Sequence, residues 1–241
     1  MISIIIPTLQ EEKAIRGTLC SLKEELSLPH EIIVSDGGSS DRTVELARPL
    51  VDKVVVYQGA TRQTIAQGRN DGAKVARGEF LLFLDADCAM PQPDDFLARA
   101  LSHFQADTNL VALTGNVRVF PDKATLRDRI VFGAMNFAAR VQCNVLGGGG
   151  CVGGEFQMVR KSAFDAIGGY REDLVTLEDR DLFLRLSRNG RKYFDPALTI
   201  FHTGRRAHIE GWPRLIVRVL LNLLLFQACG RVRSTEWRPV R

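Results

Sequence analysis

The sequence predicts an α/β fold in which a mostly parallel central sheet is flanked by helices. Three observations favour this class. Short runs of β-branched and other apolar residues alternate with helical patterns along the N-terminal half. These runs are apolar without interruption, as in strands that are buried on both faces of a sheet. Polar and acidic residues follow them directly, at the strand ends where ligands bind in open α/β sheets.

The first half of the chain predicts four strands with helices between them. Residues 1–6 are a run of β-branched residues that stops at Pro7, and apolar residues recur at helical spacing over 12–26. Each later strand is a similar run that ends in turn residues. These strands are expected at 31–35, 53–57 and 79–84, and the helices between them at 40–50 and 64–76.

The second half has a less regular rhythm. Its strands are expected at 110–120, 156–160 and 192–201, and its helices at 126–141 and 178–189. A glycine-rich stretch at 147–154 lacks the GxGxxG spacing of dinucleotide-binding proteins, and the chain has no GxxxxGK[ST] phosphate loop. Because no repeat or linker is visible, we expect one continuous domain over 1–204, followed by a tail over 205–241.

Composition excludes several protein classes. The chain has 241 residues, of which 45% are hydrophobic and 25% charged, so it is neither disordered nor collagenous. Its five cysteines show no CxxC spacing, which disfavours a disulfide scaffold or a zinc site and is typical of a reducing cytosol. The N-terminus has no basic segment typical of a signal peptide. We therefore expect a cytoplasmic protein.

The net charge is unevenly placed along the chain. Of the formal +4, the segment from Thr203 to Arg241 carries +6, since it has eight arginines, no lysine and two glutamates. The preceding residues therefore carry 4 − 6 = −2. A mildly acidic body with a basic tail disfavours nucleic acid as the partner.

Two acidic motifs follow buried strands. Asp85 and Asp87 stand one residue apart after the strand at 79–84, where one carboxylate can contact a ligand and the other a hard cation. The alternative is that acids are common where strands end in solvent. Asp36 opens the Asp-Gly-Gly-Ser-Ser-Asp turn at 36–41 and can accept hydrogen bonds from a nucleobase or ribose. A capping role for this turn, with Ser40 as N-cap and Asp41 on the helix dipole, leaves Asp36 unexplained.

Further candidates lie later in the chain. Glu178 and Asp179 open the helix at 178–189, where a carboxylate can serve as a general base or merely favour the helix N-terminus. His202 follows a strand and is structural by default, or else a further ligand beside the acids. Arg69 and Arg205 can neutralise phosphates, although surface arginines are usually solvated charges.

Jointly and in this order, the motifs resemble the family 2 glycosyltransferases of GT-A fold. The resemblance covers about the first 205 residues. Its elements are Ile4-Ile5-Ile6-Pro7-Thr8-Leu9-Gln10-Glu11-Glu12, Ile33 to Asp41, Arg69 to Ala73, Phe83 to Asp87, Gly168-Gly169-Tyr170, Leu177 to Leu182, and His202. It implies a nucleotide-sugar-binding half at 1–110 and an acceptor and catalytic half at 111–204.

The resemblance also implies roles for individual residues. Asp36 would contact the base of a UDP- or GDP-sugar, with Pro7 and Glu11 near the nucleoside. Asp85 would contact the ribose or sugar, and Asp87 would bind Mn²⁺ or Mg²⁺ on the diphosphate, with His202 as an additional ligand. Asp179 would deprotonate the acceptor hydroxyl, with Glu178 as the second choice. The expected reaction is an inverting, non-processive sugar transfer to a lipid-linked or small-molecule acceptor.

Two departures from the family's pattern stand out. Gln10 replaces the asparagine common in the first loop, and the tail lacks the Gln-x-x-Arg-Trp element of processive synthases.

Two other functions remain as alternatives. A sugar-phosphate nucleotidyltransferase would need a glycine-rich basic loop after the first strand, where this chain has Gln10-Glu11-Glu12. A non-catalytic membrane-associated adaptor would leave the acidic motifs unexplained.

The tail predicts an apolar helix over 214–229 with a narrow polar stripe of Arg214, Arg218 and Asn222. The run is shorter than the roughly 20 residues of a membrane span. Flanking tryptophans and arginines over 212–237 favour a helix in the interface of the inner membrane leaflet, which would bring the protein to a lipid-linked acceptor. A helix packed on the body or in a dimer shows the same periodicity, so the sequence leaves both open.

Overall fold

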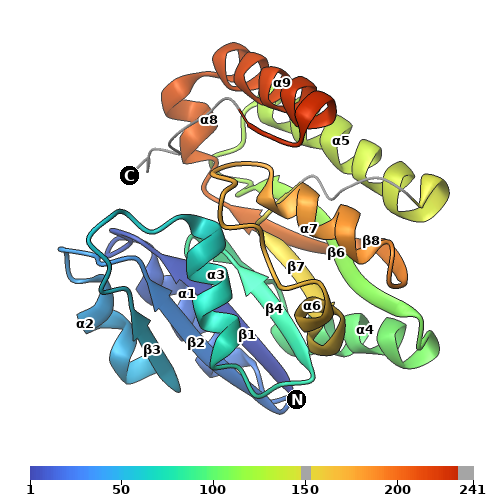
Figure 1. Ribbon diagram of the computed structural model, residues 1–241. Helices are drawn as coiled ribbons and strands as arrows, with labels where there is room; N and C mark the ends of the chain where they lie inside the picture. Colours follow the sequence, from blue (N-terminus) through green and yellow to red (C-terminus); the bar gives the residue numbers. More distant parts are fainter. Residues whose placement is uncertain (148–152, 233–241) are drawn as a thin grey trace.

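The computed structural model describes residues 1–147 and 153–232. Within these residues one sheet has the strand order β3-β2-β1-β4-β7-β6-β8-β5 (Figure 1). The strands are β1 (Ile2–Thr8), β2 (His30–Asp36), β3 (Lys53–Val56), β4 (Phe80–Leu84), β5 (Cys88–Ala89), β6 (Leu110–Val119), β7 (Phe156–Arg160) and β8 (Arg191–His202). The pairs β1–β2, β1–β4, β2–β3 and β6–β8 are parallel, while β4–β7, β6–β7 and β5–β8 are antiparallel.

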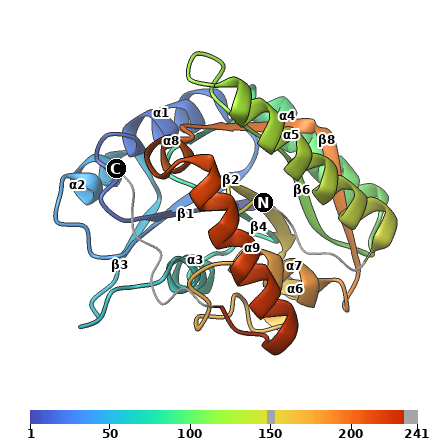
Figure 2. The same ribbon diagram turned by 90° about the horizontal axis from the view of Figure 1, so that it is seen from above.

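Helices cover both faces of the sheet. Packed against one face are α1 (Ile15–Glu25), α4 (Pro93–Ala106) and α2 (Thr43–Ala47), the last continued by the 3₁₀ turn η1 (Arg48–Leu50). Against the other lie α3 (Ile65–Lys74), α6 (Lys161–Ala166) and α7 (Glu178–Leu186). At one end of the molecule lie α5 (Leu126–Val141) with the π-helical turn η2 (Gln142–Leu146), α8 (Arg205–Glu210) and α9 (Trp212–Cys229) (Figures 1 and 2).

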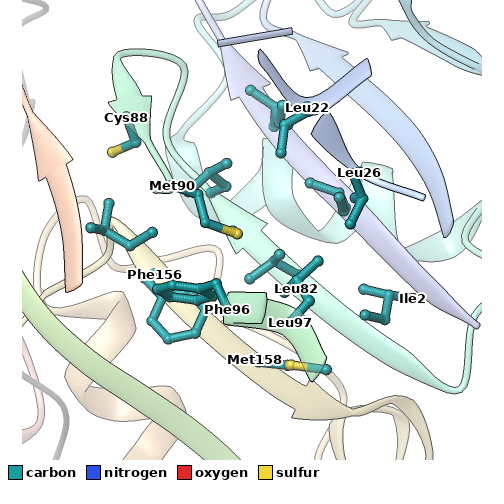
Figure 3. Close-up of a cluster of buried hydrophobic side chains, with 14 of the residues drawn as sticks. Ile2, Leu22, Leu26, Leu82, Cys88, Met90, Phe96, Leu97, Phe156 and Met158 are labelled. Atoms are coloured by element: carbon teal, nitrogen blue, oxygen red, sulfur yellow. The ribbon is translucent and has the colours of Figure 1, made fainter. Parts of the chain in front are cut away.

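The first strand explains why polar and apolar residues do not alternate in the apolar runs of the sequence. Ile4 and Ile6 point into the cluster formed with α1 and α4, and Ile5 points into the cluster formed with α3. Figure 3 shows part of the first cluster, where Leu22 and Leu26 lie over the sheet beside Ile2 and Leu82. Both faces of these strands are therefore buried, as the sequence predicts.

Several elements differ from the sequence prediction. The N-terminal amide of α2 at Thr43 donates to the Asp41 carboxylate at 3.0 Å, whereas Ser40 bonds to Gln10, so the expected Ser40 cap is wrong. The predicted helix to Leu50 narrows to a 3₁₀ turn after Ala47, with Pro49 inside it. The helices α4 and α8 and the short β5 were not predicted. Residues 148–152 of the glycine-rich stretch lie outside the described residues.

The two helices α8 and α9 are fixed to α5 by one buried carboxylate. Asp128 accepts a hydrogen bond from Trp212 Nε1 at 2.7 Å and lies 2.8 Å from His208 Nε2. Phe132 packs edge-on against the Trp212 ring, with 5.4 Å between centroids. Trp212 thus belongs to the interior and does not flank a free helix, while Trp237 lies outside the described residues.

Two of the three residues in the polar stripe of α9, Arg218 and Asn222, face the protein, whereas Arg214 is exposed. Asn222 is only 2% exposed, and Arg218 forms an ion pair with Glu210 of α8 at 2.6 Å. The opposite face presents exposed apolar side chains, among them Leu220 and Leu224. By length and composition, α9 with its 18 residues is the one described helix that could cross a membrane, whereas the sequence predicts a run too short for a span.

Candidate functional site

The ends of three parallel strands bring the N-terminal motifs to one edge of the sheet. Thr8 at the end of β1 pairs in register with Asp36 at the end of β2. On its other side β1 pairs with β4, which runs directly into Asp85. The order β2-β1-β4 therefore places the Asp36 turn, the first loop and the Asp-Ala-Asp motif side by side, as their strand-end positions predict.

Arg69 lies among the carboxylates and is not a solvated surface arginine. Its side chain is 1% exposed. Its Nη1 donates to Glu178 Oε1 at 2.9 Å, and its Nη2 donates to Asp85 Oδ1 at 3.1 Å and to the Gly154 carbonyl at 2.9 Å. The guanidinium also lies 5.3 Å from the centroid of the Tyr170 ring. One arginine thus joins the end of β4 to the start of α7.

Local sequence explains why α3 can carry a buried arginine. The helix begins with a capping box between Thr64 and Gln67. At Gly72, a Cβ atom would lie 2.4 Å from Ile5 Cγ2, so the absence of a side chain lets α3 approach β1 closely. The neighbouring Asn70 bonds through its amide to both the N–H and the carbonyl of Tyr170. These contacts fix Arg69 beneath the Gly-Gly-Tyr turn.

The run of acids at the start of α7 divides between two environments. Glu178 and Asp179 face the Arg69 side, where the Asp179 carboxylate accepts from the Arg180 N–H at 2.7 Å. Asp181 instead pairs with Arg185 at 2.6 Å. The preceding Leu177 has φ of 63°, an uncommon conformation for a branched side chain. Backbone conformations of this kind occur frequently at functional sites.

Burial changes the proton affinity of these acids. It raises the pKa of Asp85 to about 7, and the nearby Arg69 charge opposes this rise. Burial likewise raises the pKa of Glu178 to about 7 and that of Asp179 to about 6. Raised carboxyl pKa values of this kind are typical of groups that exchange protons near neutral pH.

Glu155 is a further member of this group that sequence reasoning missed. It precedes β7, burial raises its pKa, and its charge raises the pKa values of Asp85 and Asp179. Its only sequence signal is an acid between a glycine-rich stretch and a buried strand. We call Asp85, Glu155, Glu178 and Asp179, together with Arg69, the acid cluster.

A second group lies where β5 pairs with β8. Cys88 pairs in register with His202, so Asp87 lies beside the residues that follow β8. The Asp87 carboxylate accepts a hydrogen bond from the Thr203 hydroxyl and lies 3.4 Å from Arg205 Nε. His202 packs edge-on against Phe132, and burial lowers the pKa of its imidazole. The structure thus places Asp87, His202 and Arg205 together.

Arg205 joins this group to the first loop. Its two terminal nitrogens donate to the two carboxylate oxygens of Glu11, at 2.8 and 2.6 Å. This bidentate geometry is the strongest form of an arginine–carboxylate contact. Glu11 and Asp87, expected at the nucleoside and at the diphosphate respectively, are therefore bridged by the residue expected to bind phosphate.

Asp36 is engaged by its own turn. Its carboxylate accepts hydrogen bonds from the Thr8 hydroxyl at 3.0 Å, the Ser39 hydroxyl at 2.6 Å and the Gly38 and Ser39 N–H groups at 2.9 and 2.7 Å. Gln10 holds the facing loop, since its side-chain oxygen accepts from the Ser40 and Asp41 N–H groups. Gln10 has φ of 59°, a conformation that asparagine adopts more readily.

Pro7 lies at the same edge as Asp36 but is separate from the acid cluster. It is half-buried near the end of β1 and pairs in register with Ser35. A Cβ atom at Gly68 of α3 would lie 3.6 Å from the Pro7 Cβ. Pro7 therefore borders α3, on the side of the strand end where the nucleoside is expected.

Metal-ligand candidates are few. Across 1–147 and 153–232, no three His, Cys, Asp or Glu side chains are grouped so that they could hold an ion alone. Asp87 and His202 are the pair that the sequence predicts. Within the same ranges the buried His202 Nε2 atom has no hydrogen-bond partner, which is unusual for an imidazole nitrogen.

Comparisons with known sequences agree with these motifs. The family model of glycosyl transferase family 2 matches residues 3–168, which include the Asp36, Arg69 and Asp85–Asp87 motifs but not Glu178, Asp179 or His202. An uncharacterized glycosyltransferase of Haemophilus influenzae is 28% identical over 77% of this chain and 62% of its own length. The poly-beta-1,6-N-acetyl-D-glucosamine synthase of Staphylococcus aureus is 26% identical over 78% of this chain. The alignment covers 46% of that synthase, so the chain spans about half the length of these relatives.

Solved structures share the fold. The mannosyltransferase PcManGT from Pyrobaculum calidifontis, in complex with GDP-Man and Mn²⁺, superposes with a TM-score of 0.71 at 20% identity, covering 97% of this chain and 65% of its own. Staphylococcus aureus TarS 1–349 in complex with UDP-GlcNAc gives a TM-score of 0.63 at 20% identity, covering 98% of this chain and 68% of its own. The expected GT-A fold is confirmed. Since the family model matches well over half of its residues, the chain belongs to glycosyl transferase family 2.

Proposed function

We propose that the protein transfers a sugar from a nucleoside-diphosphate sugar to an acceptor hydroxyl, with a divalent cation bound at Asp87. The observation that carries this proposal is the acid cluster around Arg69, which lies where the strand-end motifs meet the start of α7. Similarity to proteins solved with GDP-Man or UDP-GlcNAc supports a GDP- or UDP-sugar as the donor. The family match favours this function over a nucleotidyltransferase or an adaptor.

Asp179 is the proposed general base. As the acceptor oxygen attacks the anomeric carbon, its proton passes to the Asp179 carboxylate, and the bond to the diphosphate breaks with its electron pair on the leaving oxygen. Attack from the side opposite the diphosphate inverts the anomeric centre. Arg69 holds the neighbouring Glu178 and Asp85 in place, while Asp85 is assigned to the ribose or sugar. Glu178 is the second candidate base.

The residues around Asp87 fit a hard divalent cation. A carboxylate and a buried imidazole nitrogen without a partner in the described ranges offer two ligands, and Mg²⁺ or Mn²⁺ commonly completes its shell with phosphate oxygens and water. When bound, such a cation stabilises the negative charge that develops on the leaving diphosphate. Arg205 would exchange its contacts with Glu11 and Asp87 for the phosphates, and Asp36, Pro7 and Glu11 would border the nucleoside.

The outward apolar face of α9 supports the proposed peripheral membrane contact through 212–237. Within its described part, polar Asn222 and Arg218 face the body, while Leu220 and Leu224 face outward. An apolar face of this kind suits the interfacial zone of a bilayer. The proposed location is cytoplasmic, at the inner face of the membrane.

The deciding experiment is thermal unfolding with a panel of UDP- and GDP-sugars, each in Mn²⁺, in Mg²⁺ and in chelator. A bound donor stabilises the native state by RT ln(1 + [L]/Kd), about 2.7 kcal/mol at a hundredfold excess over Kd. We expect one donor to raise Tm in the presence of the cation. Asp87→Ala should abolish this shift, whereas Asp122→Ala, at an exposed acid outside the site, should retain it. No shift and no sugar transfer with any donor would refute the proposal.

A further inference from the structure

A groove of about 610 Å³ runs along α5, outside the acid cluster. One wall is α5 itself, and the other is formed by the C-terminal part of β6 and by residues along β8. Figure 1 shows α5 lying across these two strands at the end of the molecule that also carries α8 and α9. None of the residues predicted from the sequence as donor, metal or catalytic residues lines this groove.

The groove is positively charged. Arg118 of β6 and Arg129 and Arg140 of α5 line it, and all three are exposed and form no ion pair within the described part of the chain. The acid in the lining, Asp128, already accepts hydrogen bonds from Thr125, His208 and Trp212. Three arginines without a neutralising carboxylate favour a ligand with more than one negative charge.

The same groove is also apolar along its length. Phe132, Phe137 and Phe201 line it, and Phe137 is 70% exposed. The outward face of α5 continues this surface, since Leu126 and Ile130 are 73% and 62% exposed. Apolar side chains exposed beside a row of arginines match an amphiphile, whose chain contacts the apolar side chains while its anionic group contacts the guanidinium groups.

The inner end of the groove leads toward the acid cluster. Phe132, Asn136 and Phe194 line both the groove and a small neighbouring pocket that also includes Glu155. Glu155 directly follows Gly154, whose carbonyl accepts a hydrogen bond from Arg69 Nη2 at 2.9 Å, so it adjoins the centre of the acid cluster. A molecule seated in the groove therefore approaches the predicted general base from the side of α5.

We propose that this groove binds the acceptor, and that the acceptor is an amphiphile carrying a phosphate or diphosphate on an apolar chain. The three arginines contact the phosphate oxygens, and Phe137 and Phe201 contact the chain. The assignment of this ligand as acceptor rests on the proposed sugar transfer, whereas its binding does not. A lipid phosphate of a bilayer and a single amphiphile molecule offer the same chemistry, so the test separates them.

Direct binding tests the groove with dodecyl phosphate below its micellar concentration. Dodecyl maltoside supplies the chain without the charge, and inorganic phosphate supplies the charge without the chain. The variant is Arg118→Gln/Arg129→Gln/Arg140→Gln. Its matched control, Arg16→Gln/Arg48→Gln/Arg188→Gln, removes the same charge at exposed arginines outside the groove. Circular dichroism and thermal unfolding verify that both variants fold.

We expect dodecyl phosphate to bind the wild-type protein and the control alike, and the groove variant about tenfold or more weakly. Inorganic phosphate and dodecyl maltoside should each bind the wild type at least about tenfold more weakly than dodecyl phosphate. Phe137→Ser should weaken dodecyl phosphate but not inorganic phosphate. Equal binding of dodecyl maltoside, or an equal loss in the control variant, would overturn the proposal.

Two further measurements distinguish a lipid phosphate in a bilayer from a single bound amphiphile, and the groove proposal from the proposed sugar transfer. If phosphatidate vesicles lose affinity in the groove variant while dodecyl phosphate does not, the arginines bind a membrane surface and the acceptor groove is refuted. Donor-induced stabilisation measured on the same variants should remain unchanged. Donor binding without dodecyl phosphate binding refutes only the groove, while the absence of any donor binding refutes the proposed function.

Discussion

Arg69 Nη1 donates a hydrogen bond to Glu178 Oε1 at 2.9 Å, although the two residues are 109 positions apart in the chain. The same guanidinium contacts Asp85, so a helix after the third strand fixes carboxylates from two later elements. Because the Arg69 guanidinium is a single buried positive charge among several acids, replacing it should disturb the positions of these acids. Arg69 is therefore a positioning residue for the acids that we assign to catalysis.

Arg69→Met should destabilise the protein by about 3 kcal/mol, because removing one partner of a buried ion pair leaves the other charge uncompensated. The Arg69 charge opposes the rise in the pKa of both Asp85 and Glu178, so these pKa values should rise further when Arg69 is replaced. At a pH below the raised pKa values the acids bind protons, which removes the uncompensated charge. The loss should therefore be larger at pH 8 than at pH 6. Urea unfolding at both pH values measures it. Arg188→Met, at an exposed arginine, should change the unfolding free energy by less than about 0.5 kcal/mol.

The rate of sugar transfer should depend on pH through the Glu178–Asp179 pair. A general base must be ionised, and burial raises the pKa values of these two acids to about 7 and about 6. The value of kcat/KM should therefore rise with pH through roughly 6 to 7 and be lost below. Glu155→Gln should move this limb to lower pH, because the Glu155 charge raises the pKa of Asp179.

Asp179→Asn should lower kcat by about a hundredfold or more while donor binding is retained. Sugar-transfer assays measure kcat, and donor-induced shifts in Tm on the same preparation measure donor binding, so the two effects are separated. Full transfer activity in Asp179→Asn, together with loss of activity in Glu178→Gln, would move the role of base to Glu178. A rate independent of pH between 5 and 8 would argue against either acid as the base.

Membrane contact should depend on the outward face of α9. Leu220→Gln/Leu224→Gln should lower binding to anionic vesicles by at least about tenfold, since each buried leucine side chain contributes about 1.5–3 kcal/mol. Flotation of the protein with vesicles measures this affinity. Leu220→Met/Leu224→Met keeps the face apolar and should bind as the wild type does. If the wild-type protein does not float, and sedimentation instead finds a dimer that the glutamines dissociate, α9 is a subunit contact.

Asp128→Asn should loosen α8 and α9 from the body. Hydrogen bonds from His208, Thr125 and Trp212 lower the pKa of Asp128 to about 2 despite its burial. A carboxyl group with a lowered pKa stabilises the native state above its unfolded pKa of about 4, and this stabilisation is lost as the pH falls toward 2.

The expected loss in Asp128→Asn is about 2 kcal/mol at neutral pH, and it should shrink to nothing as the pH approaches 2. Denaturant unfolding over this range measures it. Asp122→Asn, at an exposed acid just before α5, serves as the control and should show no comparable change. A difference between wild type and Asp128→Asn that persists unchanged at pH 2 would contradict the charge-based explanation.

Much of the fold and part of the site follow from local sequence. The strands β1, β2, β4 and β7 are short apolar runs with turn residues after them, and parallel pairing then brings Asp36 and Asp85 to one edge. The helix α5 has the predicted limits because a capping box at Thr125 starts it. In contrast, α4 was missed although Pro93 and the first-turn acids Asp94 and Asp95 are typical of a helix start, because Gln92 before them has a left-handed backbone and provides no side-chain cap.

What the sequence by itself determined is the family, the alternation of strands and helices, and the identity of the acids at the strand ends. These depend on periodicity and on short motifs, which are local. Only the tertiary structure decided that Arg69 is buried among those acids, that Glu155 joins them, and that Arg218 and Asn222 of α9 face inward. The groove along α5 is also a product of packing. Each of these features depends on which distant surface covers a residue, and periodicity carries no information about that neighbour.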